Sequence, residues 1–174
     1  AGGNKIEEVE AAIKKIKDQG NSNIIIVHGY QAFPTKLEDI NLNHLKLLKE
    51  KFNLPIALED HSEGGNKLSK IIPLMAIPYN ISAIIKHFTI DRNLKLIDHE
   101  SALNPDELKD FIPLIREAEK VLGSDSLDKK FSKDEEVYRN YVKKRIVAQK
   151  NIKKGKIIQR EDIAFKRAAD GIFP

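Results

Sequence analysis

Leu54-Pro55-Ile56-Ala57-Leu58-Glu59-Asp60-His61 is the stretch that decides the fold of this chain, because a short apolar run ends there within three residues at a histidine. The same arrangement occurs at residues 23–27, before His28, and at residues 81–85, before His87. About thirty residues separate each of these histidines from the next. A strand, a crossover helix and the next parallel strand need about that much chain, so the pattern predicts consecutive βα units in an α/β fold.

The three histidines also predict where a functional site would lie. In parallel α/β folds, the carboxyl ends of the strands open onto one face, and ligands bind on that face. Imidazole is the commonest metal-binding side chain, so His28, His61 and His87 indicate a candidate metal site. Two plainer interpretations stay open. His61 and His87 could be pocket residues bonded to the backbone, and we expect His28 to stabilise the rim of the site rather than to bind metal.

The segments between these runs have helical periodicity or helix-start signals. Helices are predicted over residues 4–19, 43–52 and 67–77, with loops at 28–41 and 88–103. Asn104-Pro105-Asp106-Glu107 combines an N-cap, a proline at the first helical position and acids in the first turn, which predicts a helix that continues to about Gly123. We expect this helix to bury four apolar side chains: Leu108, Ile112, Ile115 and Val121.

The composition of the sequence changes near its carboxyl end. Residues 123–136 are rich in Ser, Asp and Lys, which is typical of a linker. Short β-like runs follow at residues 142–147 and 156–158, around Lys153-Lys154-Gly155. The expected organisation is therefore a (β/α) domain over 1–122, a linker over 123–136 and the start of a small β-rich module over 137–174.

Composition excludes several classes of function. The chain of 174 residues has no cysteine, which removes disulfides, thiolate nucleophiles and zinc–sulfur sites. No apolar run approaches the ~20 residues that cross a bilayer, so we expect no membrane partner. The net charge of +4 comes without a basic stripe or an aromatic platform, so no nucleic-acid partner is expected either. A cytoplasmic location fits best.

Several motifs together resemble the sialic acid synthase (N-acetylneuraminate synthase) family. They follow the family's order along nearly the whole chain: HGYQAFPT at residues 28–35, EDHS at 59–62, KHFTIDR at 86–92, Asp98-His99, LNPDE at 103–107, IKKG at 152–155 and Lys166-Arg167. The resemblance implies the last three βα units of a (β/α)8 TIM barrel, followed by a linker and the truncated start of an antifreeze-like domain.

What the resemblance implies for function is a carbon–carbon bond-forming transferase. Enzymes of this family condense phosphoenolpyruvate with an N-acetylated amino sugar to give a nine-carbon 2-keto sugar acid and phosphate. A divalent metal, Mn²⁺ or Mg²⁺, assists the reaction as a Lewis acid, and the enzyme is a homodimer. The barrel strands that carry the phosphate-binding lysines and a catalytic glutamate would precede Ala1, so we expect this chain by itself to be inactive.

The resemblance also assigns roles to individual residues. The metal-binding histidines fall on His61 and His87, and the catalytic acid that contacts the sugar hydroxyls falls on Asp98. Gln31 is on the phosphoenolpyruvate side, and Phe33 is beside the sugar. In the family, an arginine of the partner subunit contacts the N-acetyl group of the sugar. Arg167 matches that arginine.

Departures from the family pattern leave two other interpretations open. Glu59 replaces the usual serine, whose hydroxyl helps to hold phosphate, and a carboxylate there repels phosphate unless a cation intervenes. Ile85 replaces the usual glutamate before the Lys-His-Phe motif. A non-catalytic or diverged sugar-binding member of the scaffold is therefore one alternative. A different (β/α) barrel aldolase or isomerase that resembles the family only locally is the other.

Overall fold

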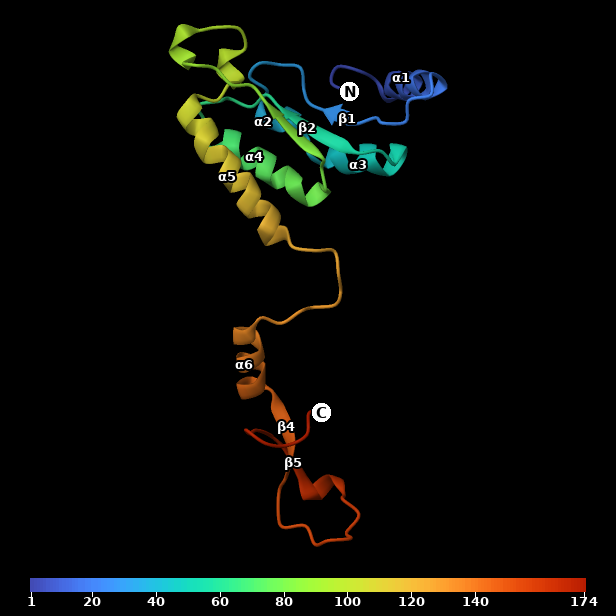
Figure 1. Ribbon diagram of the computed structural model, residues 1–174, viewed down its shortest axis with the longest axis vertical. Helices are drawn as coiled ribbons and strands as arrows, with labels where there is room; N and C mark the ends of the chain where they lie inside the picture. The colour runs from blue at the N-terminus through green and yellow to red at the C-terminus, as the bar shows by residue number, and fades with distance from the viewer. The chain divides into compact units, whose positions relative to one another are not determined.

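The computed structural model describes residues 1–174, which divide into two compact units, Ala1–Ser124 and Asp125–Pro174. Figure 1 shows the elements of both units along the chain. The first unit alternates strands and helices, and the second is built around a pair of strands. Each unit is described by itself below.

The first unit contains a three-stranded parallel sheet in the order β1-β2-β3. Its elements are α1 (Ile6–Asp18), β1 (Ile26–His28), α2 (Leu37–Ile40), α3 (Asn43–Phe52), β2 (Ile56–Asp60), α4 (Leu68–Ala76), η1 (Ile77–Tyr79), β3 (Ala83–Lys86), η2 (Arg92–Leu94), η3 (His99–Ser101) and α5 (Pro105–Leu122). The parallel α/β architecture expected from the sequence is thus confirmed.

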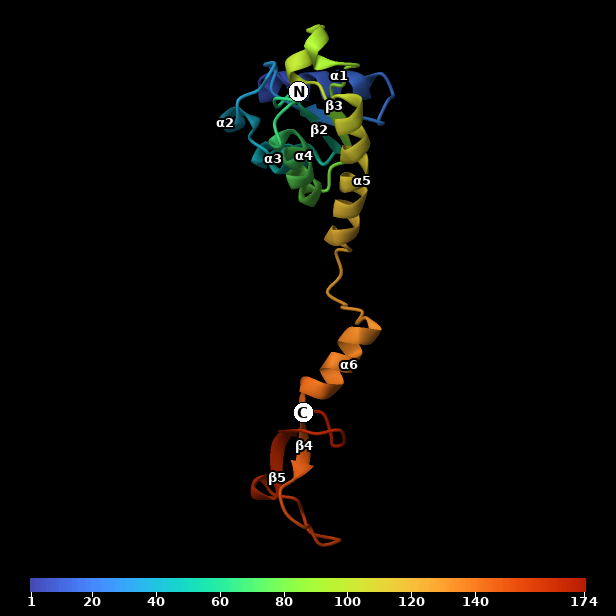
Figure 2. The ribbon, with the colours of Figure 1, turned by 90° about the vertical axis from the view of Figure 1, so that its left-hand side faces the viewer.

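The core of this unit lies between one face of the sheet and the helices. Because side chains alternate along a strand, Ile56 and Leu58 point to the same face, and both are 1% exposed. They pack in one cluster with Leu45 and Leu48 of α3 and Ala76 of α4. Figure 2 shows α3 and α4 next to β2. The opposite face of the sheet therefore carries the side chains of odd-numbered positions such as Glu59.

The register places His28 on the helix-covered face. His28 is the partner of Leu58, so its side chain points towards α3 rather than towards the face of Glu59. Its ring lies 5.0 Å from that of His44, and its Nε2 is 3.2 Å from the carbonyl oxygen of Ile40. Burial lowers the pKa of His28. The idea that all three histidines converge was therefore wrong for His28, which has a structural position.

Strand boundaries differ from the prediction in one direction. The strand predicted over residues 54–58 spans Ile56–Asp60, and the one predicted over 81–85 spans Ala83–Lys86. Both strands end in a charged residue, and a prediction from apolar runs leaves charged residues outside the strand. The helix predicted over 43–52 is confirmed as α3, whereas the short helix α2 falls in a segment predicted to be a loop.

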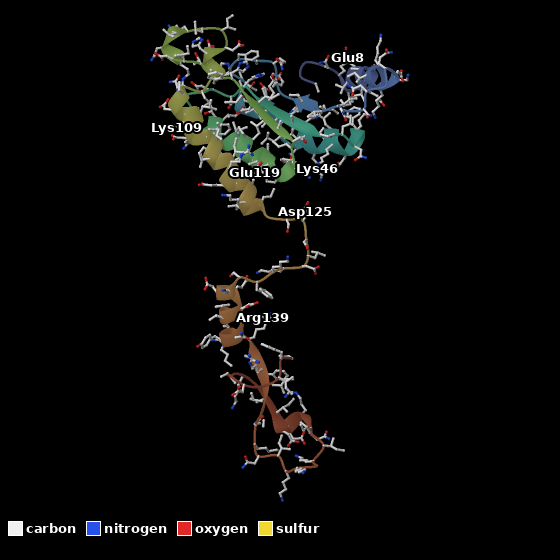
Figure 3. All side chains as sticks on the ribbon, viewed as in Figure 1. Glu8, Lys46, Lys109, Glu119, Asp125 and Arg139 are labelled. Carbon is white, nitrogen blue, oxygen red and sulfur yellow. The ribbon has the colours of Figure 1, made fainter.

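The helix signal at Asn104 is confirmed, but its buried face was partly wrong. The backbone N–H of Asn104 donates to the carboxylate of Glu107 at 2.7 Å, and the helix ends at Leu122. Phe111 is 2% exposed, whereas Ile112 is 50% and Val121 is 87% exposed. At about 100° per residue, Ile112 lies about 100° round the helix from Phe111. Val121 is in the last turn of the helix, where Leu122 is also 51% exposed. Figure 3 shows the charged side chains of Lys109 and Glu119 along this helix.

Gly64 fills a position where no larger residue fits, and this gives a first prediction. A Cβ atom at Gly64 would collide with the backbone carbonyl of Ala102, whereas one at Gly65 would meet nothing nearer than the Arg92 guanidinium at 3.6 Å. Gly64→Ala is expected to lower the free energy of unfolding by about 1–3 kcal/mol, measured by chemical denaturation. Gly65→Ala is the matched control and should change it much less; equal losses would contradict the packing.

The second unit contains α6 (Lys133–Val142), β4 (Lys144–Ala148), η4 (Arg160–Asp162) and β5 (Ile163–Arg167). β4 and β5 pair antiparallel, with Ile146 opposite Phe165. The strand expected at residues 156–158 was wrong, because the partner of β4 is β5. The helix α6 begins three residues before the predicted end of the linker, and the boundary between the compact units falls after Ser124.

A buried carboxylate organises the turn before β5. Asp162 is fully buried, and it accepts hydrogen bonds from the Lys156 ammonium at 2.5 Å and from the Gln159 N–H at 3.0 Å. The ammonium of Lys150 lies 3.0 Å from the same carboxylate. The Lys156 side chain, the Gln159 N–H and Lys150 together hold the pKa of Asp162 well below its usual range.

None of the helices in either unit is long and apolar enough to span a bilayer.

Candidate functional site

His61 and His87 meet at the carboxyl ends of β2 and β3. Each directly follows the last residue of its strand, and those last residues, Asp60 and Lys86, are register partners. The two imidazole rings lie with their centroids 5.0 Å apart at an interplanar angle of 42°. The structure therefore brings these two predicted site residues together.

Hydrogen bonds from distant loops fix the backbone of both histidines. The carbonyl oxygen of His61 accepts from the Thr35 N–H at 2.8 Å and from the Ser101 hydroxyl at 2.8 Å. The carbonyl oxygen of His87 accepts from the Leu103 N–H at 2.9 Å. Ser101 is completely buried. These anchors fix the backbone positions from which the two rings project.

The hydrogen bonding of His61 leaves one ring nitrogen available. Its Nδ1 lies 2.8 Å from the carbonyl oxygen of Tyr30, which can only accept, so Nδ1 is the donor. The Nε2 atom of a neutral ring then presents a lone pair. His61 is 2% exposed, and Nε2 is buried without a hydrogen-bond partner. A nitrogen oriented in this way is a suitable metal ligand, since ligating histidines typically donate their other N–H to a carbonyl or carboxylate.

A buried ion pair lies behind the histidines, on the opposite face of the sheet. The ammonium of Lys86 lies 2.9 Å from the carboxylate of Asp60, and their side chains are 4% and 0% exposed. Ser62 donates to the same carboxylate from its N–H at 2.9 Å and from its hydroxyl at 3.0 Å. Burial lowers the pKa of Lys86. The sequence analysis missed this pair, although two opposite charges stand at matching positions before the two histidines.

Phe33, Gln31 and Glu59 complete the surroundings of the pair. The Phe33 ring lies 4.3 Å from that of His61 and 5.7 Å from that of His87, centroid to centroid. The Gln31 amide donates to one Glu59 carboxylate oxygen at 3.1 Å. The other carboxylate oxygen lies 3.7 Å from Nε2 of His61. Gln31 and Phe33 thus lie around the histidines at the end of the sheet, and their substrate roles stay predictions.

Asp98 is not joined to the histidines by any interaction in the structure, and Arg167 belongs to the second unit. Asp98 adopts a left-handed backbone conformation, with φ of 55°, at the start of η3. Its neighbour His99 lies 2.8 Å from the Leu96 carbonyl oxygen and 3.1 Å from Glu100, and no bond joins it to the Asp98 side chain. Arg167 ends β5 in the second unit, where it lines a hollow with Tyr141. The roles of Asp98 and Arg167 remain predictions.

The loop that follows His87 is fastened to α5 by an ion pair. Arg92 pairs with Glu107 of α5 through both guanidinium nitrogens, rather than with the adjacent Asp91, and it also donates to the Ala102 carbonyl at 3.0 Å. Gly64 donates its N–H to the Glu100 carbonyl at 2.7 Å. That bond ties the segment after His61 to the same loop.

The Arg92–Glu107 pair predicts a pH dependence of stability. The Arg92 guanidinium holds the pKa of Glu107 below its ordinary value of 4.5, helped by the Asn104 N–H and by Lys70. A carboxyl group with a lowered folded-state pKa stabilises the fold above pH 4.5 and loses that contribution as the pH falls. Glu107→Gln should therefore cost about 1–2 kcal/mol of unfolding free energy at pH 7, and the difference from wild type should shrink below pH 4.5. Glu117→Gln, an exposed change on the same helix, is the control; a pH-independent difference for Glu107→Gln would contradict the assignment.

The donor set at the histidines is incomplete as a metal cage. No group of three or more His, Cys, Asp or Glu side chains is arranged to hold an ion by itself. The pair of imidazoles nevertheless fits a partial site, because the buried Nε2 of His61 has no partner within the protein. Substrate atoms or water would have to supply further ligands.

Comparison with known proteins finds one family. The model of the NeuB family matches residues 1–127. N,N'-diacetyllegionaminic acid synthase of Campylobacter jejuni is 36% identical over 167 residues, which cover 95% of this chain and 48% of that protein. Pseudaminic acid synthase of Campylobacter jejuni is 35% identical over 169 residues, which cover 97% of this chain and 47% of that protein.

Solved structures agree with this result. The crystal structure of N-acetylneuraminic acid (sialic acid) synthetase from Leptospira borgpetersenii, in complex with citrate, has a TM-score of 0.68 and 33% identity. The match covers 81% of this chain and 48% of that one. This chain therefore spans about half the length of the relatives that it matches.

Proposed function

Because this chain belongs to the NeuB family, we propose that the complete protein condenses phosphoenolpyruvate with an N-acetylated amino sugar. The product would be a nine-carbon 2-keto sugar acid, with release of phosphate. The names of the relatives, which are synthases of legionaminic, pseudaminic and N-acetylneuraminic acids, support this class of product. The observation that carries the proposal is the pair of histidines at the strand ends, with a buried and unpartnered Nε2 on His61.

His61 and His87 would hold the divalent ion, Mn²⁺ or Mg²⁺. A bound ion would supply Lewis-acid polarisation of the sugar carbonyl oxygen. The Tyr30 carbonyl oxygen accepts from Nδ1 of His61 and so leaves Nε2 for the ion. The Asp60–Lys86 pair would hold the ends of the two strands that carry the histidines. Phe33, in contact with both rings, would exclude water from one side.

The remaining residues are assigned by position. Gln31 would face phosphoenolpyruvate, Asp98 would bind the sugar hydroxyls, and Arg167 of a partner subunit would contact the N-acetyl group in a homodimer. Each of these roles rests on the motif that contains the residue. A cytoplasmic location suits an enzyme that uses phosphoenolpyruvate.

The test of the proposed function is release of phosphate by the complete protein. We expect phosphate from phosphoenolpyruvate only when an N-acetylhexosamine and Mn²⁺ are both present, and none after the metal is removed with a chelator. The 174-residue chain alone should show no turnover. Absence of release from the complete protein with any N-acetylated amino sugar would contradict the proposal.

One observation favours a second candidate, a sugar-binding protein without synthase activity. Glu59 and Ile85, the two departures from the family pattern, are register partners on the face that carries the histidines, and Ile85 is 41% exposed there. A binding protein should show a rise in melting temperature with sugar in the absence of Mn²⁺, whereas the synthase should need the metal.

A further inference from the structure

Glu59 lies on the same face of the sheet as the histidines, with one carboxylate oxygen 3.7 Å from Nε2 of His61. It is two residues before His61 on β2, so the alternation of side chains directs both towards the same side. A Cβ atom at Gly29 would lie 2.8 Å from the Cβ of Glu59, so the absence of a side chain there lets the neighbouring backbone pack closely against Glu59. The position of this carboxylate is therefore set by packing as well as by its hydrogen bond to Gln31.

One Glu59 carboxylate oxygen and one ring nitrogen of His61 face each other without a hydrogen bond. One Glu59 oxygen is occupied by the Gln31 amide at 3.1 Å, and the other lies 3.7 Å from Nε2 of His61 without a hydrogen bond. Nδ1 of His61 is the nitrogen that donates to the Tyr30 carbonyl oxygen, so Nε2 is the ring atom that is left buried without a partner. A cation between this oxygen and this nitrogen would give both atoms a partner.

We propose that Glu59 supplies a carboxylate oxygen to the divalent cation bound by His61 and His87, which gives a two-histidine, one-carboxylate ligand set. This inference rests on the proposed function and extends it to a residue at which the chain departs from the family pattern. As the structure stands, no three His, Cys, Asp or Glu side chains are arranged to hold an ion, so the Glu59 side chain would have to turn towards the histidines. The Glu59 side chain is 28% exposed and so has room to turn towards the histidines.

The ligand set explains how a carboxylate can stand where phosphate is expected nearby. Bound to the cation, the Glu59 charge is neutralised and no longer repels an anionic substrate. A carboxylate is a hard oxygen ligand, so it favours Mn²⁺ and Mg²⁺ over softer metals. It also adds a negative charge to the site, which should let the metal bind before any substrate does.

The experiment is a titration of the chelator-treated complete protein with Mn²⁺ alone, in which the electron paramagnetic resonance signal measures free Mn²⁺. Glu59→Gln keeps the shape and the contact with Gln31, and we expect it to weaken Mn²⁺ binding by at least about tenfold. Glu63→Gln, an exposed carboxylate just past His61, is the matched control and should bind as wild type does. Thermal unfolding without metal checks that the variants remain folded.

A spectrum distinguishes a ligand from a structural role. With Co²⁺ in place of Mn²⁺, Glu59→Gln should change the visible absorption bands, because they respond to the atoms bound to the metal. Wild-type affinity and an unchanged Co²⁺ spectrum in Glu59→Gln, with binding abolished in His61→Ala, would overturn the role of Glu59 and leave the histidine site intact. No Mn²⁺ binding by the wild-type protein would overturn the histidine site as well.

Discussion

Replacing His61 by Ala is expected to weaken Mn²⁺ binding by more than about 100-fold and to abolish phosphate release from phosphoenolpyruvate by the complete protein. The physical reason is that His61 offers a buried nitrogen lone pair that nothing else in the protein uses. Loss of an outer-shell partner alone typically costs 10–100-fold in metal affinity, so loss of the ligand itself should cost more. Calorimetric titration measures the affinity, and a coupled phosphate assay measures the turnover.

His44→Ala is the matched control for this change. His44 lies on α3 against His28, on the helix-covered side of the sheet, so its loss should leave Mn²⁺ affinity unchanged. His87→Ala should behave like His61→Ala. If either of these two variants bound Mn²⁺ as tightly as wild type, the paired-histidine site would be contradicted.

Lys86→Met is expected to lower the free energy of unfolding by about 3–5 kcal/mol, because it leaves the Asp60 carboxylate buried without its cation. The Lys86 and Asp60 side chains are 4% and 0% exposed, so water cannot take the place of the missing partner. Removing both charges together, in Asp60→Leu with Lys86→Met, should recover much of this loss, since an apolar pair of similar volume needs no compensation. Chemical denaturation of the two single variants and the double variant measures the coupling.

Lys70→Met is the control for the buried pair. Lys70 lies 3.6 Å from Asp110, whose side chain is 73% exposed, and pairs of this kind contribute less than about 1 kcal/mol. A loss for Lys86→Met no larger than for Lys70→Met would show that Asp60 and Lys86 do not fasten the strand ends. In that case the rigidity of the two histidines would need another cause.

The parallel βα arrangement was predictable because each strand contains a short apolar run that stands between polar segments. The prediction misplaced the ends of β2 and β3 because those strands continue into Asp60 and Lys86. These two residues are opposite each other on neighbouring strands and form an ion pair. A rule that reads charge as the end of a strand cannot detect such a pair from one strand alone.

The candidate site was predictable only in part, because the sequence shows where a strand ends but not which face its last side chains occupy. His61 and His87 each stand directly after their strand, whereas His28 is the last residue of its own strand and is level with Leu58. A shift of an odd number of residues turns a side chain to the other face, and spacing along the chain does not reveal that parity. Gln31, three residues later, is the β1-side residue that reaches the site through its bond to Glu59.

The most direct measurement is a crystal structure of the protein soaked in Mn²⁺, with anomalous scattering recorded for the metal. We predict a single peak at the carboxyl ends of β2 and β3, bonded at about 2.1 Å to a ring nitrogen of both His61 and His87. A fully soaked crystal with no peak between these two rings, or with a metal bound to only one of them, would contradict the account.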